Sequence, residues 1–212
     1  YLATIRTLSE FPLLFELMSV CPLPNIEIEN CLVALRARLL FSISSIERTS
    51  ETLGFQSALA LQCFINEYIY FSSAKEEEVL NDLQTRVKQV IRNGGSPSPH
   101  SILCLASYKA LSNYEWFNSL VSTPSIEKVF AQQITEPCRE ANLKKEIHLL
   151  DEITNEVSSK VRQQYEEKPY PRWVNLGLSP KKLSLEDLAN ILNLKLFDRS
   201  IVELESPEIL IA

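Results

Sequence analysis

Glycine is scarce in this sequence, since only four of the 212 residues are glycine. Glycine supplies the positive backbone angles of tight hairpin turns and lets a backbone approach a phosphate group closely. So low a content argues against a β-sandwich and against a glycine-rich enzyme loop within the chain. The Gly94-Gly95 pair opens a Gly-Gly-Ser-Pro-Ser-Pro run that lacks the Gly-Lys-Ser/Thr ending of a phosphate loop, so we interpret it as a turn.

Metal-binding patterns are missing as well. The chain has two histidines, His100 and His148, and neither stands in a cluster of ligand residues, so a zinc site is not expected. We interpret His100 as a loop histidine and not as a catalyst. The cysteines are odd in number, scattered and without a Cys-x-x-Cys pair: Cys21, Cys31, Cys63, Cys104 and Cys138. This pattern predicts free thiols in a reducing compartment, and hence a cytoplasmic protein.

The charge balance is mildly acidic, with a formal net charge of −6 and no arginine-rich run. A nucleic acid or an anionic membrane surface is therefore not expected as the main partner. No apolar run approaches the roughly 20 residues of a transmembrane helix. No secretory signal is visible at Tyr1. The sequence thus predicts no nucleic-acid partner and no membrane partner.

Apolar residues, 45% of the chain, recur at helical spacing through much of the sequence. Ser9 is suited to cap a first helix and Asn25 to cap a second one. In the second helix, Arg36 and Arg38 fall largely off the apolar stripe, which consists of Ile28, Leu32, Leu35, Leu39 and Ile43. We therefore predict an all-α fold, a multi-helix bundle over residues 9–130.

Residues 55–71 are apolar on nearly every side of a helix, which predicts a helix buried at the centre of the bundle. Gln62 and Asn66 lie one helical turn apart within this segment. Two interpretations remain open for them. They either satisfy neighbouring polar groups inside the bundle, as buried polar groups normally do, or line a polar pocket.

The other helical segments are marked mainly by their ends. Residues 74–92 begin with Glu76, Glu77 and Glu78 and end with basic residues, an order that complements the helix dipole. We interpret the acidic run as a solvated first turn. Residues 136–146 are charged and weakly periodic, and we interpret them as a connector on the surface. Ser184 and Asp187 resemble a capping box at the start of a later helix.

The least generic stretch is residues 164–173, Gln-Tyr-Glu-Glu-Lys-Pro-Tyr-Pro-Arg-Trp. A helical pattern capped by Asp151 runs into it. Pro169 and Pro171 each disfavour the helical conformation of the preceding residue, so the helix is expected to end there and an extended segment to follow. We call residues 165–173 the strap, because three aromatic residues, two prolines and an arginine make it both stiff and adhesive.

Residues 164–173 resemble the QYEENPYPRW segment of bacterial class I S-adenosylmethionine-dependent methyltransferases that carry tetratricopeptide repeats upstream. Lys168 stands where that segment has asparagine. Residues 60–68, Ala-Leu-Gln-Cys-Phe-Ile-Asn-Glu-Tyr, are similar to a helix that precedes the methyltransferase core in that family. The resemblance covers roughly residues 53–212. No repeat of fixed period is visible here, so the tetratricopeptide repeats are not expected within this chain.

The resemblance implies two domains. Residues 1–150 would form the helical bundle domain. Residues 151–212 would form a linker helix, the strap and the start of a truncated methyltransferase domain, in which the apolar residues 209–212 are the first strand of a Rossmann-like sheet. A glycine-rich cofactor loop would follow that strand. The chain would then be a fragment that is inactive alone, with S-adenosylmethionine bound only by the full-length protein.

The resemblance also implies a lid over the cofactor, formed by the helix and strap that precede the first strand. The cofactor-binding candidates are Tyr165, Tyr170, Arg172 and Trp173. The Arg172 guanidinium is suited to pair with the cofactor carboxylate, and the aromatic rings to lie against its sulfonium or adenine. No catalytic residue and no metal ligand are expected. An alternative role for these residues is to fix a linker to the neighbouring methyltransferase domain.

A function of another class is also open, namely a non-enzymatic helical module for protein interaction. The bundle would then dock a protein substrate or an oligomer partner. The sequence encoded after residue 212 discriminates between the two functions, because only the methyltransferase requires a glycine-rich loop there.

Overall fold

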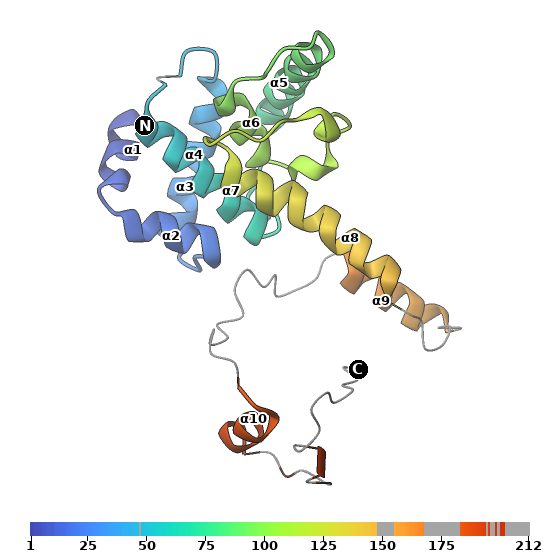
Figure 1. Cartoon of the computed structure of the whole chain (residues 1–212). Coiled ribbons are helices and arrows are strands. Elements are labelled where there is room, and N and C mark those ends of the chain that lie inside the picture. The colour runs from blue at the N-terminus through green and yellow to red at the C-terminus, as the bar shows by residue number, and fades with distance from the viewer. Residues whose placement is uncertain are drawn as a thin grey trace. The chain divides into compact units, whose positions relative to one another are not determined.

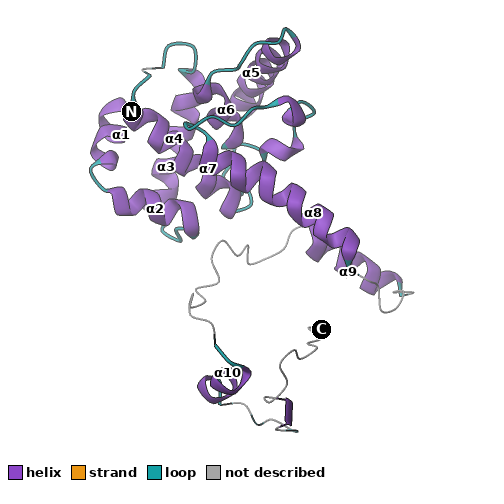
Figure 2. Cartoon of the chain, viewed as in Figure 1, coloured by secondary structure: helices purple, strands orange, loops and turns teal. Residues whose placement is uncertain are grey.

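The computed structural model describes residues 1–46, 48–147, 155–167, 183–193, 195, 198, 200 and 201. The chain divides into two compact units, Tyr1–Val174 and Asn175–Ala212. Within the described residues there are helices and no strand (Figure 2), which confirms the predicted all-α fold for that part of the chain. The predicted strand at residues 209–212 lies outside the described residues, and so does the predicted domain boundary between residues 150 and 151.

The first unit begins with a helix that the sequence analysis missed. Helix α1 (Leu2–Ser9) buries Ile5, and α2 (Pro12–Val20) follows after a two-residue break. Ser9 is therefore not the cap of a helix, as predicted, but the last residue of α1, where its hydroxyl donates to the carbonyl oxygen of Ile5 at 2.9 Å. Pro12 starts α2 because a proline lacks only a backbone N–H that a first helical turn does not use. The bundle thus begins earlier than predicted.

Helix α3 (Ile26–Phe41) begins where the sequence predicts. The Asn25 side-chain oxygen accepts from the backbone N–H groups of Glu27 and Ile28, both at 3.0 Å, which confirms Asn25 as its cap. The stripe residues Leu32, Leu35 and Leu39 are buried.

Helix α4 (Ser50–Ile65) is buried along most of its length and packs against α1, α2, α6 and α7, in agreement with the predicted central helix. Its predicted end at residue 71 is wrong. The helix stops at Ile65, and Glu67 and Tyr68 then adopt positive φ angles of 59° and 58°. Ile69 and Phe71, predicted to be buried, are 71% and 76% exposed. Tyr70, between them, is buried in the core, so the segment after the turn alternates between exposed and buried residues and does not continue the helix.

Helix α5 (Ala74–Arg92) has the predicted limits, and Ser73 forms a capping box with Glu76. Glu77 and Glu78 are exposed, as predicted, but Glu76 is buried, so the prediction of a solvated first turn is wrong at this residue. Helix α6 (Pro99–Ala106) includes His100, which is only 3% exposed. The prediction of a loop histidine is therefore wrong, because the helix begins immediately after the Gly-Gly-Ser-Pro-Ser turn.

After α6, two short 3₁₀ turns, η1 (Leu111–Asn113) and η2 (Phe117–Ser119), carry aromatic residues onto the bundle. Tyr114 and Trp116 are buried, and their rings stack with centroids 4.8 Å apart.

A nearly continuous rod follows, made of α7 (Glu127–Phe130), a π-helical turn η3 (Ala131–Thr135) and α8 (Glu136–Glu146). Residues 136–146 were predicted to be a surface connector and are instead helical. Their weak periodicity has a simple cause, since α8 has no fully buried residue and so needs no apolar stripe. Gln133 anchors the π-turn: its side chain accepts from Leu111 N and donates to the carbonyl oxygens of Ala60 and Ala106 at 3.1–3.2 Å.

Helix α9 (Glu156–Glu167), orange in Figure 1, is joined to α8 by an ion pair between Lys144 and Glu166 at 2.6 Å. Its predicted cap, Asp151, lies outside the described residues; the side chain of Asn155 accepts from Ser158 N. In the second unit, α10 (Leu185–Ile191) begins with the predicted capping box of Ser184 and Asp187.

The buried residues of the first unit form two clusters, and α4 contributes to both. One side of α4 packs with α1–α3, through residues such as Phe55 and Leu59, and the other with α5–α7, through Ala60 and Leu61. Of the helices that the structure describes, none combines the length and the apolar character needed to span a bilayer.

Candidate functional site

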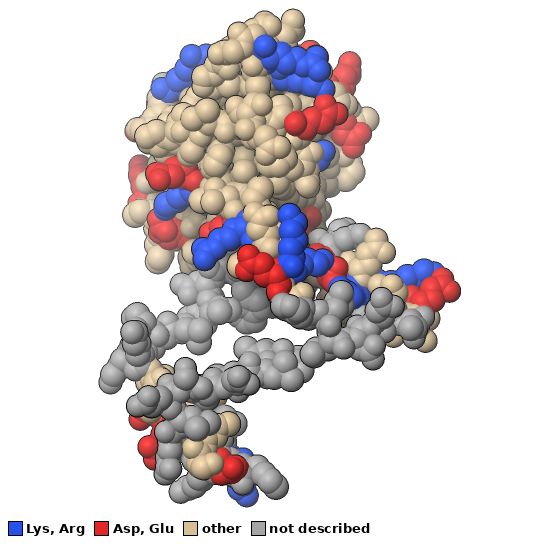
Figure 3. Space-filling model, turned by 45° about the vertical axis from the view of Figure 1, so that its right-hand side comes forward, with Lys and Arg blue, Asp and Glu red and all other residues tan. Residues whose placement is uncertain are grey.

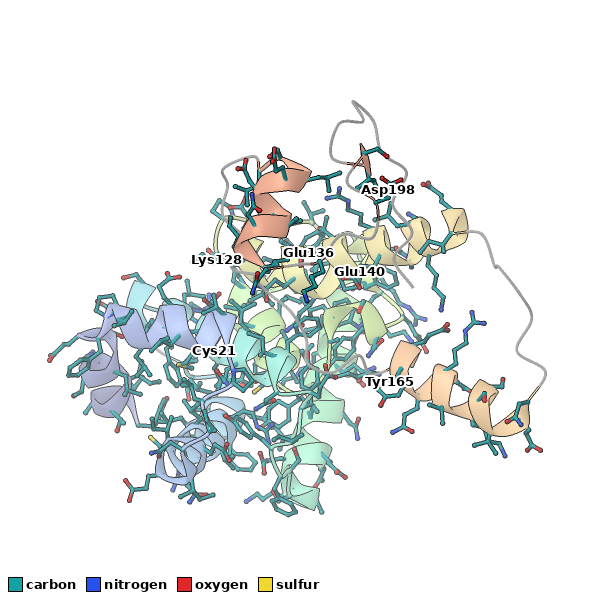
Figure 4. All side chains as sticks on the ribbon, turned by 90° about the horizontal axis from the view of Figure 1, so that it is seen from below. Cys21, Lys128, Glu136, Glu140, Tyr165 and Asp198 are labelled. Atoms are coloured by element: carbon teal, nitrogen blue, oxygen red, sulfur yellow. The ribbon has the colours of Figure 1, made fainter. Side chains whose placement is uncertain are left out.

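Of the four residues predicted to bind the cofactor, one lies in the described part of the chain. Tyr165 is on the last turns of α9, 65% exposed. In Figure 4 it lies well apart from Cys21, which follows α2, and from Lys128 on α7. Tyr170, Arg172 and Trp173 lie outside the described residues. A cofactor site formed by these four side chains thus stays a prediction.

Tyr165 belongs to an exposed apolar stripe on α9. Val157, Val161 and Tyr165 are spaced by four residues, which places them on one helix face, and all three are exposed. Beside Tyr165, the carboxylate of Glu166 accepts from Lys144 and Arg162, each at 2.6 Å, and these two cations lower the Glu166 pKa. The last turn of α9 therefore carries an aromatic ring next to a compensated carboxylate.

Sequence reasoning missed the most distinctive polar cluster, which is centred on Arg36. Its side chain is 1% exposed, although the sequence analysis placed it off the apolar stripe with Arg38. Nη2 donates to the carbonyl oxygen of Phe71 at 2.7 Å and to the Ser72 hydroxyl at 3.1 Å. The guanidinium also lies over the Tyr108 ring, 4.2 Å from its centroid.

Glu76 supplies the negative charge of this cluster. One carboxylate oxygen lies 3.9 Å from Arg36 Nη2 and accepts from the Tyr108 hydroxyl at 2.8 Å, and the other accepts from Ser73. Burial favours the protonated carboxyl, but the hydrogen bonds from Ser73 and Tyr108 and the charge of Arg36 outweigh it and lower the Glu76 pKa. The pKa of Tyr108 is raised. Its burial is the largest cause, and the hydrogen bond to Glu76 is the second.

The Arg36 cluster is best explained as a structural connection. It joins α3, the 66–72 segment, α5 and α6, and the charges of Arg36 and Glu76 are met by partners within the protein, as buried charges must be. One sequence signal points to it: Arg36 lies four residues from both Leu32 and Leu40, which are buried, so it shares their helix face.

A groove of about 550 Å³ lies between α2, α4 and the start of α7. Its apolar walls include Phe15, Leu53 and Leu61, and Gly54 lies between them. Glu16 on α2 pairs with Lys128 on α7 at 3.3 Å, and both residues line the groove. The volume is within the range of ligand pockets, which is about 300–1,000 Å³.

Gln62 and Asn66 serve internal partners. With its amide nitrogen facing the end of α2, Gln62 donates to the carbonyl oxygens of Met18 and Cys21, both at 3.1 Å, and its oxygen accepts from Leu23 N at 3.2 Å. The Asn66 oxygen accepts from Tyr68 N at 3.1 Å. For Gln62 these contacts favour the first of the two interpretations, in which buried polar groups satisfy neighbouring backbone groups. Asn66 does so only through its oxygen, because its buried amide nitrogen has no hydrogen-bond partner among the described residues.

The described residues show no cluster of metal ligands and no disulfide. No group of three or more potential metal ligands occurs there, and all five cysteines are unpaired. On the face shown in Figure 3, basic and acidic side chains of the first unit lie intermixed among uncharged residues. Comparison of the chain with protein-family models, with curated proteins and with solved structures gave no match.

Proposed function

We propose that this chain is the helical region that precedes the catalytic core of a class I S-adenosylmethionine-dependent methyltransferase, and that α9 and the strap contribute a lid over the cofactor. The observation that carries the proposal is the sequence of residues 164–173, with its resemblance to that family. The position of this sequence at the end of α9 supports it: the helix extends to Glu167, just before Pro169.

In this proposal the residues of the strap bind the cofactor through electrostatics and stacking. Arg172 holds the carboxylate of the methionine moiety in a two-pronged hydrogen bond. Tyr165, Tyr170 or Trp173 lies against the sulfonium, since the face of an aromatic ring attracts a cation. The exposure of Tyr165 leaves its ring available for such a contact. Residues 209–212 would be the first strand of a Rossmann-like sheet, whose cofactor site lies at the carboxyl ends of the strands.

Calorimetric titration with S-adenosylmethionine tests the proposal. The 212-residue chain should not bind it, whereas a chain extended through the sequence encoded after Ala212 should. In the extended chain, Arg172→Ala should weaken binding by about 1.5–3 kcal/mol, the range for hydrogen bonds to charged groups. Arg162→Ala is the matched control, because the Arg162 side chain pairs with Glu166 on the same helix.

The two parts of the proposal fail separately. Absence of binding by the extended chain would refute the methyltransferase assignment. Binding that Arg172→Ala leaves unchanged would assign the strap to the alternative role of a structural linker to the neighbouring domain.

The groove between α2, α4 and α7 favours a second candidate function, a helical module that docks a protein substrate or a second copy of the chain. Gly54→Gln tests the groove without damage to the fold, because a Cβ added at Gly54 meets only the Phe15 ring edge, at an ordinary 3.9 Å. Glutamine also favours a helix more than glycine does. If the groove mediates self-association, sedimentation should show an oligomer for the native chain and a monomer for Gly54→Gln. A native monomer would exclude the second copy as the partner.

A further inference from the structure

A second groove, of about 490 Å³, lies where the turn before α6 meets the start of α4. It differs from the α2–α4–α7 groove in being lined, apart from Leu53, by polar and proline residues. These are Arg48, Ser96, Pro97, Ser98, Pro99 and His100. None of these residues belongs to the strap or to the Arg36 cluster, so the proposed methyltransferase function does not account for the groove.

His100 is the buried polar residue of this groove, with 3% of its surface exposed. Its Nδ1 lies 2.6 Å from the Gln56 side-chain oxygen, while the Gln56 side-chain nitrogen donates to the His100 carbonyl oxygen at 3.3 Å. Because the amide nitrogen is the donor to a carbonyl, the amide oxygen must accept, so Nδ1 carries the proton. In the neutral ring, Nε2 is then an unprotonated acceptor.

Nε2 makes no hydrogen bond to any residue that the structure describes. Nδ1 faces Gln56 in the interior, which leaves the opposite edge of the ring, with Nε2, for the groove that His100 lines. Nε2 is not one of the fully buried polar atoms without a partner, so it is open to the groove. The ring therefore offers a fixed hydrogen-bond acceptor to a molecule in the groove.

The same groove is also lined by hydrogen-bond donors. Arg48 is exposed and makes no ion pair with a described residue. Ser98 precedes the first residue of α6, yet its hydroxyl does not cap the helix. With Ser96, the groove thus combines a guanidinium and two hydroxyls with one acceptor nitrogen.

We propose that this groove binds the phosphate group of a small phosphate monoester. A phosphate monoester is unusual among common anions because its second pKa is near 6, so it presents both negative oxygens and a P–OH donor close to neutral pH. The oxygens suit Arg48, Ser96 and Ser98, and the P–OH suits Nε2 of His100. A carboxylate or a sulfate offers acceptors only and leaves Nε2 without its partner. The groove volume leaves room for an organic substituent beside the phosphate.

Nitrogen-15 NMR of the imidazole groups tests the proposal, because the chain has only two histidines and His100→Gln assigns their signals. Inorganic phosphate is the probe and sulfate the matched control. Phosphate should shift the His100 signals saturably and bind at least ~10-fold more tightly than sulfate, which lacks the donor. Arg48→Gln should weaken phosphate binding by ~10-fold or more, as expected for loss of a charged hydrogen bond. His148→Gln should leave the His100 titration unchanged.

Three results would overturn the proposal. One is a spectrum in which Nδ1 of His100 carries no proton in the neutral ring. Another is a phosphate response that does not saturate or that persists in Arg48→Gln. The third is equal affinity for sulfate, which would reduce the groove to a general anion site. None of these readouts involves S-adenosylmethionine, so failure here is distinct from failure of the methyltransferase proposal.

Discussion

Replacing Arg36 with leucine should be the most damaging single exchange of a charged residue in the first unit. The guanidinium is 1% exposed and holds the 66–72 segment through Phe71 O and Ser72 Oγ, at 2.7 and 3.1 Å. Its removal leaves the Glu76 carboxylate without the nearby cation. The same exchange two residues later, Arg38→Leu, removes an exposed arginine from the same helix.

The size of the effect follows from what remains after the exchange. Removing one partner of a buried ion pair costs about 3–5 kcal/mol. Glu76 keeps its hydrogen bonds from Ser73 and Tyr108, and leucine fills part of the vacated volume, so Arg36→Leu should lie near the lower end, at ~3 kcal/mol. Arg38→Leu should change the free energy of unfolding by no more than about 0.5 kcal/mol, as surface substitutions usually do.

Urea denaturation at pH 7, followed by circular dichroism, measures both variants by linear extrapolation. The comparison is valid where the denaturant slope stays constant. A loss below about 1 kcal/mol for Arg36→Leu, or equal losses for the two arginines, would refute the buried cluster. A Glu76→Gln variant adds a further check: if the pair interacts directly, the double variant should lose less stability than the sum of the two single variants.

Three further predictions concern the core, the thiols and pH. Phe64→Ala should lower the free energy of unfolding by about 3–5 kcal/mol. Phe71→Ala, at a residue 76% exposed, should lower it by no more than about 0.5 kcal/mol. Similar losses of stability for the two variants in urea denaturation would contradict the end of α4 at Ile65. Alkylation of the unfolded, unreduced protein should modify five cysteines. In the native protein Cys63 and Cys104 should be protected, because burial raises the pKa of each to about 12. Two or more cysteines that stay unmodified after unfolding would indicate a disulfide. Burial, and then the charge of Arg48, lower the pKa of His100, so below the ordinary histidine value of about 6.5 the unfolded chain binds a proton that the folded chain does not. Stability should therefore be full above that value and should fall as the pH drops below it. The slope should be reduced in His100→Gln and retained in His148→Gln, and an unchanged slope in His100→Gln would argue against the depressed pKa.

The sequence by itself determined the features that neighbouring residues decide. The cap of α3 at Asn25, the capping box at Ser184 and the limits of α5 were all predicted correctly, because each rests on a side chain and backbone groups within one helical turn. The central position of α4 was predicted as well, since a helix that is apolar on nearly every side needs neighbours all round. The candidate cofactor residues also come from the sequence, as three of the four lie outside the described residues.

Only the tertiary structure decided which polar residues are buried. The spacing of Arg36 from Leu32 and Leu40 indicates its helix face but not its partners, which lie 34–36 residues away along the chain. His100 likewise bonds Gln56 at a separation of 44 residues. Such partners are brought together by the packing of α3, α4, α5 and α6, and the local periodicity of the sequence does not predict which helices pack together. The end of α4 was missed for the same reason. Residues 68–71, Tyr-Ile-Tyr-Phe, continue the apolar composition, yet after the turn at Glu67 and Tyr68 the side chains of Ile69 and Phe71 are exposed.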